Sequence, residues 1–145
     1  MITDYDRNLA HTVREMVANF NRMLRKQINS PEELSVAEEN VIRQLIDKQE
    51  AIPSMLCKQL KISSQFMSQV LTRLEKLGYI SRQPSKTDKR KSLIFLSKTG
   101  LNKLHQRRKK KEEFLASLIS KCYRKKEKEL LGTSLSLMAQ LYEGI

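Results

Sequence analysis

The chain has 145 residues, with 28 Lys and Arg against 16 Asp and Glu, a formal net charge of +12 at pH 7. This length can bury roughly 70% of the unfolded surface, so no metal or disulfide is needed for a core, and no apolar run approaches the ~20 residues of a membrane span. The acidic N-terminus lacks a signal-peptide pattern, and two cysteines, Cys57 and Cys122, form no disulfide framework. We expect one cytoplasmic domain. The composition disfavours a membrane protein, a secreted disulfide scaffold and a disordered chain.

The positive charge is concentrated in the middle of the chain. Residues 53–111 hold sixteen basic and two acidic side chains, a net charge of +14, whereas residues 1–52 carry −2 and residues 112–145 carry 0. Such a field favours a polyanionic partner, with nucleic acid first and an anionic membrane surface second. A single basic run, such as residues 107–111, fits a solvated helix face equally well, but the whole segment favours nucleic acid.

The first half of the chain has helical periodicity. Apolar residues at steps of three and four predict a long amphipathic helix over about 6–29, which Asn29-Ser30-Pro31 ends. Ser35 and Glu38 form a capping box that begins a second helix ending near Gln49. This second helix turns four apolar residues inward: Val41, Ile42, Leu45 and Ile46. A short third helix begins at Pro53 and ends by Lys61.

The second half combines helices with a hairpin. Ser63 caps a fourth helix over about 64–77, which ends before Gly78, a residue that tolerates a left-handed cap. Short strands over 79–82 and 92–96 flank a polar turn. Ser97 then caps a long helix over 98–123, and a last helix covers about 125–143. The predicted class is mainly α with a small β-hairpin (α+β).

Three helices followed by a hairpin is the order of a winged helix-turn-helix, here about residues 34–97. In that unit the N-terminal residues of the second helix of the turn meet base edges in the major groove. These residues are Ser64, Gln65, Ser68 and Gln69, and Gln can bond adenine bidentately. Any surface helix has a polar outer face, so this helix alone is weak support.

The turn between the two strands is strongly basic. It contains Lys86, Lys89, Arg90 and Lys91. Together with Arg73 of the preceding helix, these cations would hold phosphates or enter the minor groove, although turns are often simply solvated. We expect the lone acid, Asp88, to orient the guanidinium of Arg90 or Arg73 instead of touching DNA, because a carboxylate repels phosphate.

Three segments carry a family resemblance: residues 71–82 (LTRLEKLGYISR), residues 88–90 (DKR) and residues 96–100 (LSKTG). In order and separation they resemble the R-L-E-x-x-G-L-I-x-R, D-x-R and L-T-x-x-G stretches of the MarR family of winged helix-turn-helix transcriptional regulators, and the likeness spans residues 34–104. It implies a homodimer on a pseudo-palindromic operator, usually a repressor and often released by a small ligand, with Arg90 in the minor groove. The sequence departs from the family at three positions: Lys61 replaces a common Gly, Cys57 a common Ala, and Lys91 a small residue.

The helices at the two ends of the chain are too long and too apolar on one face to serve only a DNA lobe of about 65 residues. We expect helices 6–29 and 98–143 to form a homodimer interface, with packing within one chain as the alternative. A two-fold dimer would separate its reading helices by about 34 Å. Met16, Phe20 and Met23 would line an effector pocket, although such a stripe is more often simply core.

No catalytic, cofactor or metal motif is found in the sequence. His11 and His105 are far apart, without Cys, Asp or Glu at ligand spacing, and there is no glycine-rich phosphate loop. The spacing places Cys57 on the inner face of its helix, which favours structural burial over redox sensing. The expected function is therefore sequence-specific binding of double-stranded DNA. The alternatives are a basic winged helix that binds RNA or a protein, or a small enzyme or structural helical protein with an incidental basic face.

Overall fold

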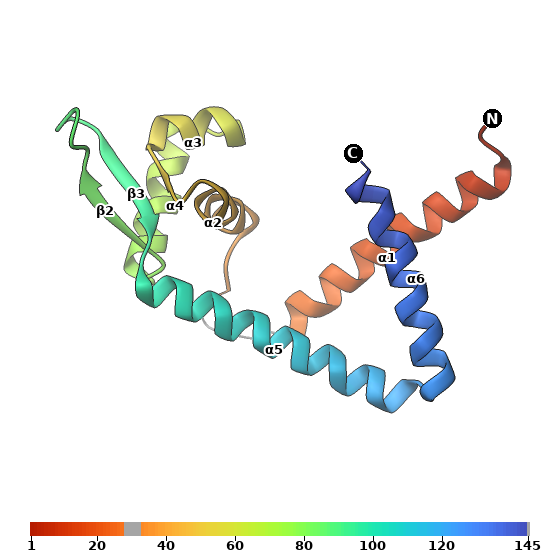
Figure 1. The fold of residues 1–145 in the computed structure, drawn as a ribbon. Helices are drawn as coiled ribbons and strands as arrows, with labels where there is room; N and C mark the ends of the chain where they lie inside the picture. Colours follow the sequence, from red (N-terminus) through yellow and green to blue (C-terminus); the bar gives the residue numbers. More distant parts are fainter. Residues whose placement is uncertain (28–32, 145) are drawn as a thin grey trace. The chain divides into compact units, whose positions relative to one another are not determined.

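The computed structural model describes residues 1–27 and 33–144, and it is mostly helical with one small antiparallel sheet (Figure 1). Two compact units, 1–107 and 108–145, divide within the fifth helix. The predicted helix stop at Asn29-Ser30-Pro31 lies outside the described residues. In chain order the elements are α1 (Asp4–Gln27), α2 (Val36–Lys48), β1 (Glu50–Ala51), α3 (Pro53–Leu60), α4 (Ser64–Lys76), β2 (Ile80–Pro84), β3 (Ser92–Leu96), α5 (Lys98–Cys122) and α6 (Lys125–Glu143). The predicted fold class is confirmed.

Helices α2, α3 and α4 begin at the residues that the sequence predicted. The Oγ of Ser35 accepts the N–H of Glu38, and the carboxylate of Glu38 accepts the N–H of Ser35 at 2.7 Å, which completes the capping box of α2. The Oγ of Ser63 accepts the N–H of Phe66 at 3.2 Å and starts α4. Pro53 occupies the first turn of α3, where its missing N–H leaves no bond unmade.

The link between α3 and α4 bends through Lys61, which adopts a left-handed conformation with φ 54° and ψ 44°. The N–H of Ile62 donates to the carbonyl of Cys57 at 3.2 Å and closes the end of α3. The sequence therefore keeps the left-handed bend without glycine, at a cost of about 1 kcal/mol. Gly78 follows Leu77, the C-cap of α4, and has φ 80°, the left-handed conformation that its position predicted.

The sheet has three strands in the order β1–β3–β2, one more than the predicted hairpin. β2 pairs with β3 in a register that places Ile80 opposite Leu96. β1 pairs with the other edge of β3 and places Ala51 opposite Ile94. β1 has two residues, too few for an alternating pattern to be visible in the sequence. The base of the hairpin is consequently joined to the α2–α3 link.

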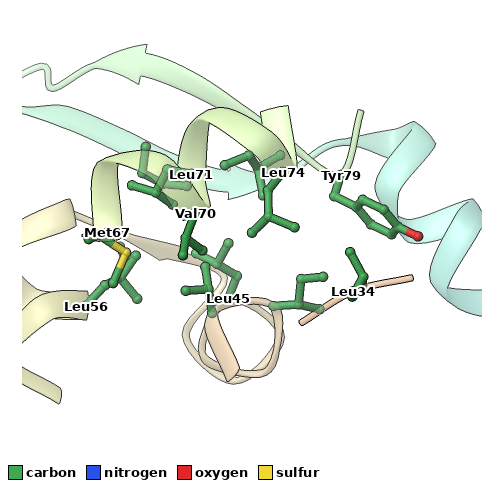
Figure 2. Packing of buried hydrophobic residues seen from close by; sticks show 13 residues of the cluster. Leu34, Leu45, Leu56, Met67, Val70, Leu71, Leu74 and Tyr79 are labelled. Atoms are coloured by element: carbon green, nitrogen blue, oxygen red, sulfur yellow. The ribbon is translucent and has the colours of Figure 1, made fainter. Parts of the chain in front are cut away.

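The core lies among α2, α3, α4 and the sheet (Figure 2). Its buried hydrophobic residues are Leu34, Val41, Ile42, Leu45, Ala51, Leu56, Met67, Val70, Leu71, Leu74, Tyr79, Ile80 and Ile94. Cys57 is half-buried against this core, in line with a packing role. Ile46, which the periodicity turned inward, is exposed, so that prediction was wrong: α2 buries a narrower stripe than its apolar residues suggest.

The start of α5 is fastened to the residues that follow α4. The hydroxyl of Ser97 donates to the carbonyl of Gly78 at 2.6 Å and accepts the N–H of Gly100 at 2.8 Å. A Cβ at Gly100 would lie 2.1 Å from the carbonyl oxygen of Tyr79. Only glycine allows this close approach, which gives the L-T-x-x-G resemblance a steric cause.

The two terminal helices bury little within the described chain. Neither α1 nor α6 contains a buried residue. Arg25, near the end of α1, pairs with Glu39 of α2 at 2.6 Å. At the start of α1, hydrogen bonds from the hydroxyl and N–H of Thr3 lower the pKa of Asp6 below its ordinary value.

Candidate nucleic-acid interface

Helix α4 has one buried face and one exposed face. Met67, Val70, Leu71 and Leu74 are fixed in the core, as Figure 2 shows. The predicted base-reading residues, Ser64, Gln65, Ser68 and Gln69, are all exposed. Core packing on one side and the Ser63 cap at the end therefore hold these polar side chains where solvent, or a ligand, can reach them.

Two further exposed residues extend this face toward the C-terminal end of α4. Thr72 and Lys76 follow Gln69 at steps of three and four, which places them in line with Gln65 on the helix surface. Neither residue was predicted from the sequence, where Arg73 was the one residue after Gln69 in this helix assigned to DNA. The spacing from Gln65 was the signal that would have identified them.

Arg73 has a different setting from the other predicted DNA contacts. Its Nη1 donates to the carboxylate of Glu38, a residue that is only 3% exposed, and its Nη2 donates to the carbonyl of Glu33 at 3.1 Å. The guanidinium thus joins the middle of α4 to the start of α2. This arrangement favours a role in holding α4 and does not support the expected phosphate contact.

The turn of the hairpin is organised by its own backbone and by Asp88. The Oδ1 of Asp88 accepts the N–H of Arg90 at 3.0 Å, and its carbonyl accepts the N–H of Lys91 at 2.9 Å. The N–H of Ser85 donates to the carbonyl of Lys91 at 2.8 Å and closes the turn. Asp88 therefore bonds the main chain of Arg90, and not a guanidinium as the sequence suggested.

The cations of this turn are exposed. Lys86, Lys89, Arg90 and Lys91 are all on the surface, and no ion pair joins them to an acidic side chain in the ranges 1–27 and 33–144. We call these four residues the wing cations. In Figure 1 the hairpin of β2 and β3 projects from the lobe, with its turn at the end remote from α5. Its charge is available to an anion.

An ion pair connects the hairpin to α4. The Nε of Arg82, on β2, donates to Glu75 of α4 at 2.8 Å. Because this pair neutralises itself, it adds nothing to the net field, but it links the strand that carries the wing cations to the helix that carries the glutamines. The exposed face of α4 and the hairpin therefore belong to one packed lobe.

The predicted effector residues lie on α1. Met16 and Phe20 are exposed, and Met23 is half-buried. Their shared face is therefore accessible in the single chain, which leaves their role as a prediction.

Two general features concern the described part of the chain. None of its helices combines the length and apolar character required to cross a membrane. Nowhere in residues 1–27 and 33–144 do three or more His, Cys, Asp or Glu residues gather in a geometry suited to a metal ion.

Comparisons with known proteins agree with this geometry. Residues 34–91 match the model of the MarR family. An uncharacterised HTH-type transcriptional regulator of Mycobacterium bovis is 24% identical over 140 residues, 97% of this chain and 96% of that protein. The structure of the transcriptional regulator Tm0710 from Thermotoga maritima has a TM-score of 0.76 at 17% identity, covering 95% of this chain and 96% of that one.

A third relative was solved with a nucleic acid. It is a mutant of MepR from S. aureus bound to an oligodeoxyribonucleotide, with a TM-score of 0.69 at 17% identity, covering 91% of this chain and 96% of that one. The sequence match covers α2, α3, α4 and β2 and ends before β3, and the structural likeness extends over almost the whole chain. By both comparisons, this chain is similar to the MarR family of winged helix-turn-helix transcription regulators.

Proposed function

We propose that this chain is a repressor that binds a pseudo-palindromic DNA operator as a homodimer. The observation that carries the proposal is one lobe that presents both the exposed polar face of α4 and the exposed wing cations. Hydrogen-bonding side chains on a helix suit base edges, and free cations suit phosphates or the minor groove. The DNA bound to the S. aureus relative supports the same use of this fold.

The proposal divides the work between two groups of residues. Ser64, Gln65, Ser68 and Gln69 read bases, whereas the wing cations hold the backbone and Arg90 enters the minor groove. Asp88 fixes the conformation of the turn through the N–H of Arg90. Arg73, bonded to Glu38, positions α4 for these contacts.

The homodimer is supported by the exposed apolar residues of the terminal helices. On α1 these include Tyr5, Leu9 and Val17, and on α6 they are Leu130, Leu135, Leu137, Leu141 and Tyr142. Apolar surface of this extent on a soluble chain marks a partner surface, and a second copy provides a symmetric partner.

Sedimentation at micromolar concentration tests the dimer. The expected species has the mass of two chains. Leu137→Asp should weaken the dimer, whereas Ser136→Asp, an equal charge on the neighbouring exposed position, should weaken it less. A monomeric wild-type protein would contradict the symmetric mode of binding.

DNA recognition is tested by selecting bound fragments from a random duplex library, with structured RNA as competitor. The expected product is an inverted repeat whose half-site centres are about one helical turn apart. Arg90→Ala should weaken binding to all sequences, and Gln65→Ala should change the preference among them. Equal effects of both variants on selected and random DNA would refute this division, and preference for the RNA would identify an RNA-binding module instead.

We also propose that a small apolar effector releases the operator by binding at Met16, Phe20 and Met23, and that operator occupancy blocks transcription. A transcription assay in vitro with the selected site in the promoter tests repression, where stimulation by the protein would contradict it. A panel of apolar compounds added to the DNA complex tests release. Met16→Ala should blunt release, whereas Met55→Ala, an exposed methionine on α3, should not.

A further inference from the structure

We infer that α4 reads A·T base pairs and that Phe66 contributes to this choice by packing against the methyl group of thymine. The inference rests on the proposed function, because it requires α4 to lie in the major groove. It adds the base-pair class of the half-site, and it adds Phe66 to the four base-reading residues of α4.

Phe66 occupies an unusual place for a large apolar side chain. It is the third residue of α4 and is 44% exposed, whereas the next residue, Met67, is 1% exposed. Its N–H donates to the Oγ of Ser63 and caps the helix, a main-chain bond that any residue other than proline can make at this position. The ring therefore lies at the N-terminal end of the helix, the part that reaches base edges in helix-turn-helix proteins.

The neighbours of Phe66 suit the same base pair. Gln65 precedes it, and Gln69 follows it by three residues, on the adjoining part of the helix surface. The NH2 group of a glutamine amide donates to N7 of adenine and its carbonyl oxygen accepts from the N6 amino group, and the thymine methyl is the apolar group of the major groove. An amide beside an aromatic ring thus complements both partners of A·T pairs.

The same stretch lacks the residues that usually recognise guanine. Residues 62–72 contain no Lys or Arg, and the guanidinium of Arg73 is bonded to Glu38 and Glu33. Bidentate Arg or Lys to guanine is the commonest specific contact in the major groove. The first two turns of α4 therefore favour adenine and thymine, because they present glutamine amides and an aromatic ring and contain no Lys or Arg.

The test uses the duplex recovered from the random library, synthesised with thymine or with deoxyuridine, which lacks only the methyl group. Each thymine of one half-site is replaced in turn, and the dissociation constant is measured at fixed salt. For wild-type protein, one replacement should weaken binding about 4-fold, which corresponds to one methyl group returned to water. Phe66→Ala should bind thymine and deoxyuridine at that position with a ratio near 1.

Met55→Ala is the matched control, because Met55 is an apolar residue of α3 with similar exposure, 48%. It should retain the 4-fold ratio. Circular dichroism and thermal unfolding establish that both variants are folded, as expected for substitutions of exposed side chains. A further readout that does not depend on affinity is the half-site itself, which should be rich in A·T pairs in its major-groove segment.

The inference is overturned if no thymine shows sensitivity to its methyl group, if Phe66→Ala keeps the wild-type ratio, or if the half-site consists of G·C pairs. Each of these results leaves sequence-specific binding by the dimer intact. Failure to recover any sequence from the library is a different result, because it removes the proposed function and the inference together.

Discussion

Replacing Arg73 by methionine tests whether this residue stabilises the fold or contacts DNA. Its guanidinium is bonded to Glu38, whose side chain is almost fully buried, so the substitution leaves a buried carboxylate without its cationic partner. The N–H of Ser35 continues to bond that carboxylate, which limits the damage. We expect the free energy of unfolding to fall by about 2 kcal/mol.

That magnitude follows from the surroundings of the pair. Breaking a fully buried ion pair by removing one partner costs about 3–5 kcal/mol, whereas an exposed pair contributes about 0–1 kcal/mol. Here the Glu38 side chain is 4% exposed and that of Arg73 is 45% exposed. A loss between the two ranges is therefore expected.

Urea unfolding at one protomer concentration measures the loss, with Arg90→Met as the matched control. Both variants remove one guanidinium, but Arg90 is an exposed wing cation without an ion-pair partner in the described part of the chain. Arg90→Met should leave the free energy of unfolding within about 0.5 kcal/mol of wild type and should weaken DNA binding. The double variant Glu38→Gln/Arg73→Met should regain part of the stability, because it leaves no unpaired buried charge.

The result that would refute this reasoning is an Arg73→Met protein as stable as wild type. Stability equal to that of Arg90→Met, combined with an equal loss of DNA affinity, would return Arg73 to the group of phosphate contacts. The position of α4 would then depend on core packing alone.

Three other outcomes are expected. Gly100→Ala should lower the free energy of unfolding by about 3 kcal/mol in thermal or urea unfolding, because its Cβ would lie 2.1 Å from the carbonyl oxygen of Tyr79. Gly132→Ala, with no atom within 4 Å of the added Cβ, should be neutral or stabilising. Similar losses of stability in the two variants would exclude the steric cause. Lys61→Gly should stabilise by about 0.5–1 kcal/mol by relieving the left-handed strain, and a loss would show that the side chain of Lys61 contributes more than the strain costs. The logarithm of DNA affinity should fall against the logarithm of salt with a slope of about −5 to −9, as for six to ten neutralised phosphates, and a flat response would contradict the role of the wing cations.

Local signals predicted most of the element boundaries. The caps at Ser35 and Ser63, Pro53 and Gly78 act within three or four residues, so the sequence alone contains nearly all the information about them. The prediction of a helix over about 64–77 was accurate because its apolar residues are spaced for one face, and Met67, Val70, Leu71 and Leu74 are buried on that face.

Long-range partners were the part that sequence reasoning missed. Strand β1 exists only because β3 lies beside it, and two residues carry no periodic signal. Ile46 fits the helical stripe of α2, yet it is 50% exposed in the part of the chain that the structure describes. The partner of Arg73 is 35 residues away, and the sequence offers several carboxylates without indicating which one is buried.

The candidate site divides in the same way. Which residues of α4 face outward followed from periodicity, and Gln65 and Gln69 needed no structure to identify. The role of Asp88 did not follow, because a carboxylate can bond a guanidinium or a main-chain N–H, and only the conformation of the turn decides between them.

The three-stranded sheet has one more consequence, for how the hairpin withstands thermal motion. Its two strands have five residues each, and a lone hairpin of that size is marginal in water. The two-residue pairing of β1 with the opposite edge of β3 holds the base of this hairpin in place. Ala51→Pro, which would disturb the pairing of Ala51 with Ile94, should therefore loosen the turn that carries the wing cations more than it unfolds the helices.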